Sequence, residues 1–406
     1  MLARLPDGEP APADGTLPQA ALAELGERPL GVYVHVPFCA TRCGYCDFNT
    51  YTAADLPGGG SRAAFAAAAI AELRLARRVL GGDAPPVATV FFGGGTPTLL
   101  PAGDLAAILR AIDDELGLAP GAEVTTEANP ESVGPAALGE LRAAGFTRVS
   151  LGMQSAAEHV LATLDRTHTP GRAGEAAAEA RAAGFEHVSL DLIYGTPGER
   201  DEDWRASLDA ALAAGPDHVS AYGLIVEPGT RLAAQVRRGE LPAPDQDVLA
   251  ERYEVAEETL GAAGLSWYEI SNWAAAPEAR CRHNLGYWRG SDWWGIGPGA
   301  HSHVGGVRWW NVLHPSTYAE RLAAGNSPAH ARELLDPAAR RFERIMLETC
   351  LAEGLDTALL DAAGCAAAAR AASDGLADPA ALATGRIRLT LRGRLIADTV
   401  VQQLVG

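Results

Sequence analysis

The chain has 406 residues, 48% of them hydrophobic, which suits two domains or one large α/β domain with an appendage. The formal net charge of −18, from 51 acidic and 33 basic residues, disfavours nucleic acid and anionic lipid as permanent partners, because both require clustered lysine and arginine. No stretch approaches the roughly 18 apolar residues that a membrane-spanning helix requires, and residues 1–29 read as a loose leader without the pattern of a secretory signal.

Short β-rich runs then alternate with alanine-rich helical stretches. The predicted strands are Gly31–Val36, Ala88–Phe92, Glu123–Thr126, Arg148–Leu151, His187–Ile193, His218–Leu224 and Trp267–Ile270. The predicted helices lie near Arg62–Leu80, Asp104–Leu116, Pro135–Ala144, Ala173–Ala183, Asp201–Ala214 and Asp247–Ala262. This alternation is typical of βαβ units around a parallel sheet. Six or seven units favour an α/β fold with a partial or complete (β/α) barrel over residues 30–270.

The pattern changes after residue 270. Residues 271–330 are rich in Trp, His and Gly and have no clear helical or strand period, so we expect this segment to pack on the barrel. Within it, Trp293–His303 is expected to form a glycine-rich loop near the barrel mouth. Residues 331–406 predict a small C-terminal helical or winged domain, with a strand from Arg386, a turn at Arg392-Gly393 and a final amphipathic helix.

Polar and glycine-rich segments follow four of the predicted strands. They are Gly93–Gly95, Glu127–Pro130, Gly152–Gln154 and Gly195–Pro197. Ligands of parallel α/β folds bind at the carboxyl ends of the strands. The four segments are therefore predicted to converge on one site.

Three of the six cysteines, Cys39, Cys43 and Cys46, lie within eight positions directly after the first long strand. In the cytoplasm, where we expect the chain to reside, such crowding indicates metal or redox chemistry rather than disulfides. Three thiolates can each bind one iron of a [4Fe–4S] cluster and leave the fourth iron free for a small molecule with an amine and a carboxylate. A structural zinc site that also uses His35 is the alternative, although no second Cys-x-x-Cys knuckle exists.

The cysteine spacing, with an aromatic residue before the last cysteine, resembles that of the radical S-adenosylmethionine (SAM) superfamily. Longer motifs resemble the oxygen-independent coproporphyrinogen III oxidase-like family from about residue 30 onward. These motifs are Tyr33–Cys39, Cys46–Asn49, Gly93–Pro97, Glu127–Pro130, Leu164–His168 and Asp191–Gly195. The resemblance implies a radical SAM barrel that carries a [4Fe–4S] cluster on the three cysteines and SAM as a second cofactor.

The resemblance also implies a SAM site, and the residue chemistry is compatible with it. Glu127 suits the methionine ammonium group, Arg166 its carboxylate, and Asp191 the ribose diol. The full set of predicted SAM residues is Tyr33, Tyr45, Gly94, Gly95, Thr96, Glu127, Gln154, Arg166 and Asp191. Each of these residues also has a purely structural alternative. The glycines would form a plain strand-to-helix turn, and Glu127 would cap a helix at the surface. Arg166 would be solvent-exposed and partly neutralised by Asp165.

The family that the chain resembles has two branches. Its oxidases carry a further cysteine two residues after the third cluster cysteine, where this chain has Phe48. Its haem chaperones, of the HemW type, carry His-Asn-x-x-Tyr-Trp, which this chain matches at residues 283–288. The resemblance therefore implies haem as a ligand, held by His283, Asn284, Tyr287 and Trp288. The alternative is a packed, hydrogen-bonded His283 in a wall of the SAM site.

The main hypothesis is a haem chaperone that binds haem and transfers it to an acceptor protein, without an assigned catalytic residue. The alternative is a radical SAM oxidase that decarboxylates coproporphyrinogen III in porphyrin biosynthesis, and a weaker one is a radical SAM enzyme for another substrate. The sequence leaves open the haem acceptor, a homodimer and a transient association with membranes. It also leaves open the roles of Cys281, His301 and His303.

Overall fold

The computed structural model describes residues 7–56, 60–166 and 169–405. Its centre is a run of parallel strands, each close to its predicted position. They are β2 (Leu30–Val36), β3 (Val87–Gly94), β4 (Leu118–Ala128), β5 (Arg148–Gln154), β6 (His187–Tyr194) and β7 (His218–Gly223). β5 is buried along its whole length, as expected for a parallel sheet that is covered on both faces.

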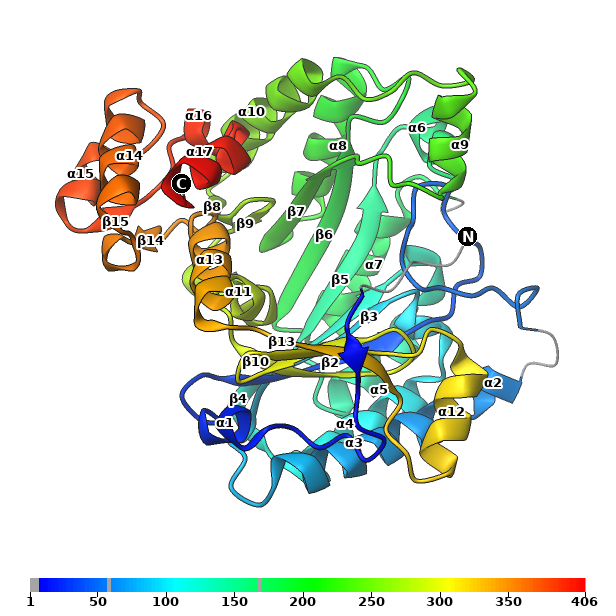
Figure 1. Cartoon of the computed structure of the whole chain (residues 1–406). Coiled ribbons are helices and arrows are strands. Elements are labelled where there is room, and N and C mark those ends of the chain that lie inside the picture. The colour runs from blue at the N-terminus through cyan, green and yellow to red at the C-terminus, as the bar shows by residue number, and fades with distance from the viewer. Residues whose placement is uncertain (1–6, 57–59, 167–168, 406) are drawn as a thin grey trace.

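Helices connect these strands and pack against one another in chain order around the outside of the curved sheet (Figure 1). They are α3 (Phe65–Leu80), α4 (Ala102–Leu116), α5 (Pro135–Ala143), α7 (Arg172–Ala182), α8 (Asp201–Ala213) and α10 (Gln246–Ala262). Gly81 and Gly117 follow the ends of α3 and α4 with φ of 79° and 75°, a conformation that glycine adopts at little cost. The predicted alternation of strands and helices is confirmed.

The sheet has thirteen strands in the order β1-β13-β12-β11-β10-β2-β3-β4-β5-β6-β7-β9-β8, in which β9 (Asn272–Ala274) pairs antiparallel with β7 and β8. β10 (Asp292–Ile296) pairs parallel to β2, so the parallel part continues beyond the predicted units. Among the residues that the structure describes, the end strands β1 (Glu9–Pro10) and β8 (Ser266–Glu269) do not pair with each other. The fold is therefore an open, partial barrel, as predicted.

Two sequence expectations about the flanking segments are wrong. Trp293–His303 is not a loop, because it contains β10 and the start of β11 (His301–Val304). β11, β12 (Val307–Asn311) and β13 (Ala329–Leu334) extend the sheet by antiparallel pairing. The leader is ordered over residues 7–29, since β1 pairs with β13 and α1 (Gln19–Ala23) buries Ala21. Strands this short, paired with strands far away in the sequence, show little of the alternating hydrophobic pattern by which a strand is predicted.

The C-terminal region has a hydrophobic core of its own, separate from the core of the barrel. It consists of α13 (Pro337–Glu348), β14 (Leu355–Asp356), α14 (Ala362–Ser373), α15 (Pro379–Ala383), β15 (Arg386–Ile387), α16 (Leu391–Leu395) and α17 (Ala397–Val405). In Figure 1 this orange and red region lies beside α10 and β8. The turn expected at Arg392-Gly393 is wrong: both residues lie in α16, and Thr390 caps this helix by accepting the Gly393 N–H at 3.2 Å. The predicted boundaries at residues 30, 271 and 331 stay a prediction.

No helix in the described part of the chain combines the length and the apolar character needed to cross a membrane.

Candidate functional site

The three clustered cysteines lie on a loop that follows β2. A β-bridge between Phe38 and Tyr51 closes this loop, and the Cys39 N–H donates to the Tyr51 carbonyl at 3.0 Å. Burial raises the pKa of the Cys39 thiol, and it raises the pKa of Cys46 to about 12. Without a cation beside them, these thiols are therefore held neutral.

A cavity of about 460 Å³, here called the barrel cavity, opens beside the cysteine loop at the carboxyl ends of the parallel strands. It brings together nearly all of the predicted cluster and SAM residues. Its lining includes Cys39, Cys43, Cys46, Tyr45, Gly94, Gly95, Thr96, Glu127, Gln154, Arg166, Asp191 and Asn284. Tyr33 is the exception, because it does not line this cavity; its hydroxyl hydrogen-bonds to the His35 Nδ1 at 2.9 Å.

The glycine loop after β3 is pressed against the cysteine loop. Gly94 has φ of 102°, and a Cβ atom there would overlap the His35 ring. A Cβ atom at Gly95 would lie 2.6 Å from the Phe38 carbonyl oxygen. Both positions therefore require glycine, which lets the two loops approach closely.

Glu127, at the end of β4, faces the barrel cavity and not the outer surface. Its Oε2 accepts the Gly94 N–H at 3.0 Å. Burial, assisted by the charge of Asp191, raises the pKa of Glu127 to about 7. The surface-cap alternative is therefore excluded, and the carboxyl group is placed where a cation would restore its ionised form.

Arg166 points toward the cysteine loop. Its Nη1 donates to the Cys43 Sγ at 3.5 Å and its Nη2 to the Asn129 Oδ1 at 2.8 Å. The neighbouring Asp165 instead pairs with Arg231 at 3.1 Å, so it does not neutralise Arg166. Arg166 is thus a partly buried cation beside the predicted cluster, and its buried Nε has no hydrogen-bond partner in the described structure.

Asp191, on β6, is held by serine hydroxyls on the strands around it. Ser150 Oγ donates to both of its carboxylate oxygens at 2.9 Å. Burial raises the pKa of Asp191, although hydrogen bonds from Ser220 and Ser150 oppose this shift. Gln154 closes β5 in a left-handed conformation with φ of 64°, which is costly for a residue other than glycine.

The donor set around the three cysteines fits a [4Fe–4S] cluster better than zinc. Both ring nitrogens of His35 already have partners, the Tyr33 hydroxyl and the Asn49 carbonyl, each at 2.9 Å. Among the described residues, no three Cys, His, Asp or Glu side chains gather around one point, as a single metal ion requires. A four-iron cluster instead binds each thiolate through a different iron.

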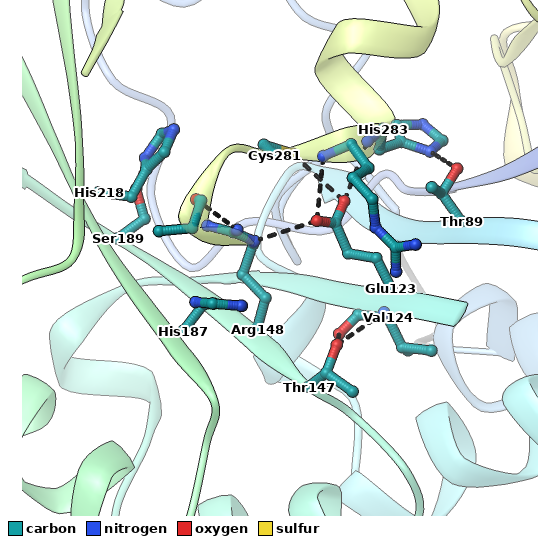
Figure 2. A network of polar contacts seen from close by, with 12 residues as sticks. Thr89, Glu123, Val124, Thr147, Arg148, His187, Ser189, His218, Cys281 and His283 are labelled. Carbon is teal, nitrogen blue, oxygen red and sulfur yellow. Dashed lines mark hydrogen bonds and ion pairs between the residues drawn. The ribbon is translucent and has the colours of Figure 1, made fainter. Parts of the chain in front are cut away.

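The His-Asn-x-x-Tyr-Trp motif forms α11 (Arg282–Trp288), which Glu123 anchors to β4. Figure 2 shows Glu123 below the start of this helix. Its carboxylate accepts the backbone N–H groups of Arg282 at 3.0 Å and His283 at 2.9 Å, and the Cys281 thiol at 3.6 Å. Arg148 balances the charge of Glu123 at 3.5 Å, and the two side chains are only 1% and 4% exposed. The network fixes α11 inside the molecule.

His283 itself is enclosed. It is 3% exposed, its Nδ1 hydrogen-bonds to Thr89 at 2.8 Å, and its Nε2 to the Tyr287 hydroxyl at 2.9 Å. Its ring also stacks on Phe91 at a centroid distance of 5.2 Å. Burial lowers its pKa to about 4, so the imidazole is neutral. This conformation matches the packed alternative rather than an open haem ligand.

The other three residues of the motif lie in three different surroundings. Asn284 lines the barrel cavity, whereas Trp288 packs against the small apolar cluster that contains Leu285 and Leu351. Tyr287 faces a second cavity of about 320 Å³, here called the side cavity. Its lining is Tyr33, His35, Asp47, Phe48, Asn49, Tyr287, Trp293, Gly299, His301 and Leu313.

Several residues of the barrel cavity were missed by the sequence prediction. The prediction gave no role to Asn129, Arg148 or Ser150, which line the cavity. It also gave none to Glu123, which anchors α11 and does not line the cavity. Arg148 and Ser150 stand four and two positions before Gly152 on β5, the strand that Gln154 ends. Because alternate residues of a strand share a face, this spacing was the signal that would have found them.

Comparisons with known proteins agree with this arrangement. The family model described as Radical SAM superfamily matches residues 33–211. The structure of coproporphyrinogen III oxidase (HemN) from Escherichia coli is similar with a TM-score of 0.80 and 23% identity, over 97% of this chain and 94% of that one. This likeness concerns the fold.

Sequence relatives are more specific. "Heme chaperone HemW" of Mycobacterium tuberculosis is 57% identical, over 95% of this chain and 97% of the relative. "Heme chaperone HemW" of Escherichia coli is 37% identical, over 68% and 70%. The mouse mitochondrial "Radical S-adenosyl methionine domain-containing protein 1" is 40% identical, over 71% and 64%. The chain is thus of the radical SAM class and belongs to the HemW family within it.

Proposed function

We propose that this protein is a haem chaperone, which binds haem and delivers it to an acceptor protein. The observation that carries the proposal is the 57% identity, over nearly the whole chain, to a relative named as a heme chaperone. Phe48 supports it, because the oxidases that the chain resembles have a cysteine at this position. A haem carrier needs no catalytic residue, and none is assigned.

The proposed cofactors are a [4Fe–4S] cluster on Cys39, Cys43 and Cys46, and SAM in the barrel cavity. When bound, such a cluster supplies an open iron for SAM and an electron for its reduction. Arg166 and Asn129 would orient the methionine carboxylate end, with Gln154 beside them. Glu127 would pair with the ammonium group, and Asp191, with Ser150, would hold the ribose hydroxyls. Each of these groups lines the barrel cavity.

The second candidate function is a radical oxidase that acts on coproporphyrinogen III. The observation in its favour is the complete set of predicted cluster cysteines and SAM residues beside one cavity. Phe48 weighs against it.

The experiment that tests the proposal separates the two functions. Anaerobically reconstituted protein is titrated with haem, and the loaded protein is then mixed with an apo-haemoprotein. We expect haem binding in a defined stoichiometry and its transfer to the acceptor. In parallel, SAM, a reductant and coproporphyrinogen III are added. Release of carbon dioxide would favour the oxidase, and failure to bind haem would reject the chaperone.

A further inference from the structure

The side cavity contains a histidine that the proposed function has not used. His301 begins β11, and its side chain is exposed. Its backbone carbonyl accepts the Trp293 Nε1–H at 3.0 Å, but no described residue forms a hydrogen bond with its ring nitrogens. The imidazole of His301 therefore has free nitrogens at the edge of a cavity, in contrast to that of His283.

The walls of the side cavity are suited to a flat, apolar ligand. Tyr33, Tyr287 and Trp293 line it together with Phe48, which is 58% exposed. Trp293 packs edge-on against Tyr287 at 4.8 Å between ring centroids. Aromatic walls of this kind offer large apolar area with fixed geometry.

The charge state of His301 also suits coordination. One face of its ring stacks on Trp310, and the partial desolvation of the ring, assisted by the positive charge of Arg308, lowers the pKa of His301. The imidazole is therefore neutral at pH 7, and a neutral imidazole is the form that binds iron.

We propose that haem binds in the side cavity, with His301 as the axial ligand of its iron. This inference rests on the proposed function as a haem chaperone, and it assigns the place where the haem binds. Binding forms one iron–nitrogen bond and changes no oxidation state. The His-Asn-x-x-Tyr-Trp motif then supports the haem site without binding the iron. Tyr287 forms part of the cavity wall. His283 positions Tyr287 through the 2.9 Å hydrogen bond between the His283 Nε2 and the Tyr287 hydroxyl.

The cavity explains how haem would remain transferable. At about 320 Å³ it is too small to enclose a whole haem, so part of the macrocycle would stay outside. Its described lining has one carboxylate, Asp47, and no lysine or arginine, so the propionates are expected to face solvent. Asp47 and Phe48 line both cavities. Bound haem would therefore lie next to the cysteine loop and within reach of an acceptor.

The test compares three variants with the wild-type protein, each carrying its reconstituted cluster. Hemin is titrated into His301→Ala, His301→Tyr and the control His330→Ala, which removes an exposed histidine from β13 outside both cavities. We expect His301→Ala to weaken hemin binding at least tenfold. We expect His301→Tyr to retain hemin with an absorption spectrum of a changed axial ligand, and His330→Ala to behave as wild type. Equal iron and sulfide content of all variants verifies that they are folded.

The outcomes distinguish this site from the proposed function. If the wild type binds and transfers hemin, but both His301 variants keep its affinity and spectrum, the site is wrong and the chaperone function stands. His283→Ala serves as a fourth variant. Loss of the histidine-type spectrum in it, with an unchanged spectrum in His301→Ala, would assign the iron to His283 instead. If the wild type does not bind hemin, both proposals fail.

Discussion

The barrel cavity and the side cavity adjoin at Asp47 and Phe48, yet the sequence describes them very differently. The barrel cavity is built from the parallel strands and the loops that follow them, whose side chains turn toward a shared opening at the carboxyl ends of the strands. The side cavity lies between the cysteine loop and four elements, β2, α11, β10 and β11, that pair or pack laterally. A sequence motif at a strand end thus indicates residues that contact a ligand. A motif on a helix that packs against a sheet can instead hold the wall of a cavity in place.

The largest effect is expected at the cysteine loop. Cys39→Ala removes one of three cluster thiolates, so the variant should lose nearly all cluster iron and the brown absorbance near about 400 nm. Iron and sulfide are measured after anaerobic reconstitution. Cys365→Ala, an exposed cysteine of the C-terminal region, is the matched control and should keep both. Full iron content in Cys39→Ala would contradict the cluster assignment.

The second prediction tests whether α11 is support. Glu123→Ala leaves the start of α11 and buried Arg148 without their partner, and breaking such a buried pair costs about 3–5 kcal/mol. We expect the free energy of unfolding in urea to fall by about this amount. Glu353→Ala removes an exposed partner of Arg289 and should cost less than about 1 kcal/mol. Equal stabilities of the two variants would show that the network does not hold the helix.

The third prediction concerns a single contact in the barrel cavity. Arg166→Ala should weaken SAM binding about thirtyfold, because a hydrogen bond to a charged group contributes about 2 kcal/mol. Equilibrium dialysis of the reconstituted protein measures it. Arg231→Ala removes the neighbouring, exposed arginine that pairs with Asp165 and serves as the control. Wild-type affinity in Arg166→Ala would remove this residue from the site.

The smallest effect is a pH dependence. Burial and the charge of Asp191 raise the pKa of Glu127 to about 7, so its carboxyl group is ionised above that pH and neutral below it. SAM affinity should therefore fall about tenfold as the pH falls from 8 to 6, in proportion to the ionised fraction. Glu127→Gln should bind weakly at both values. A flat profile in the wild type would argue against pairing between Glu127 and the ammonium group.

The sequence predicted the barrel cavity well for a physical reason. Glu127, Arg166 and Asp191 belong to motifs at or just after strand ends, and parallel strands bring those ends together. The side cavity was not predictable in this way. Trp293 lies on β10, which joins β2 from about 260 residues away in the sequence, and such pairing leaves no local pattern. Whether a histidine is enclosed, as His283 is, or open, as His301 is, depends on those same long-range contacts.

The central claim is that three thiolates hold a cluster whose remaining iron is free for SAM. The most direct test is the electron paramagnetic resonance spectrum of the reduced, reconstituted protein with and without SAM. A change in the spectrum of the cluster upon addition of SAM is the predicted result. An identical spectrum in saturating SAM, or purified protein that contains zinc in place of iron at these cysteines, would contradict the claim.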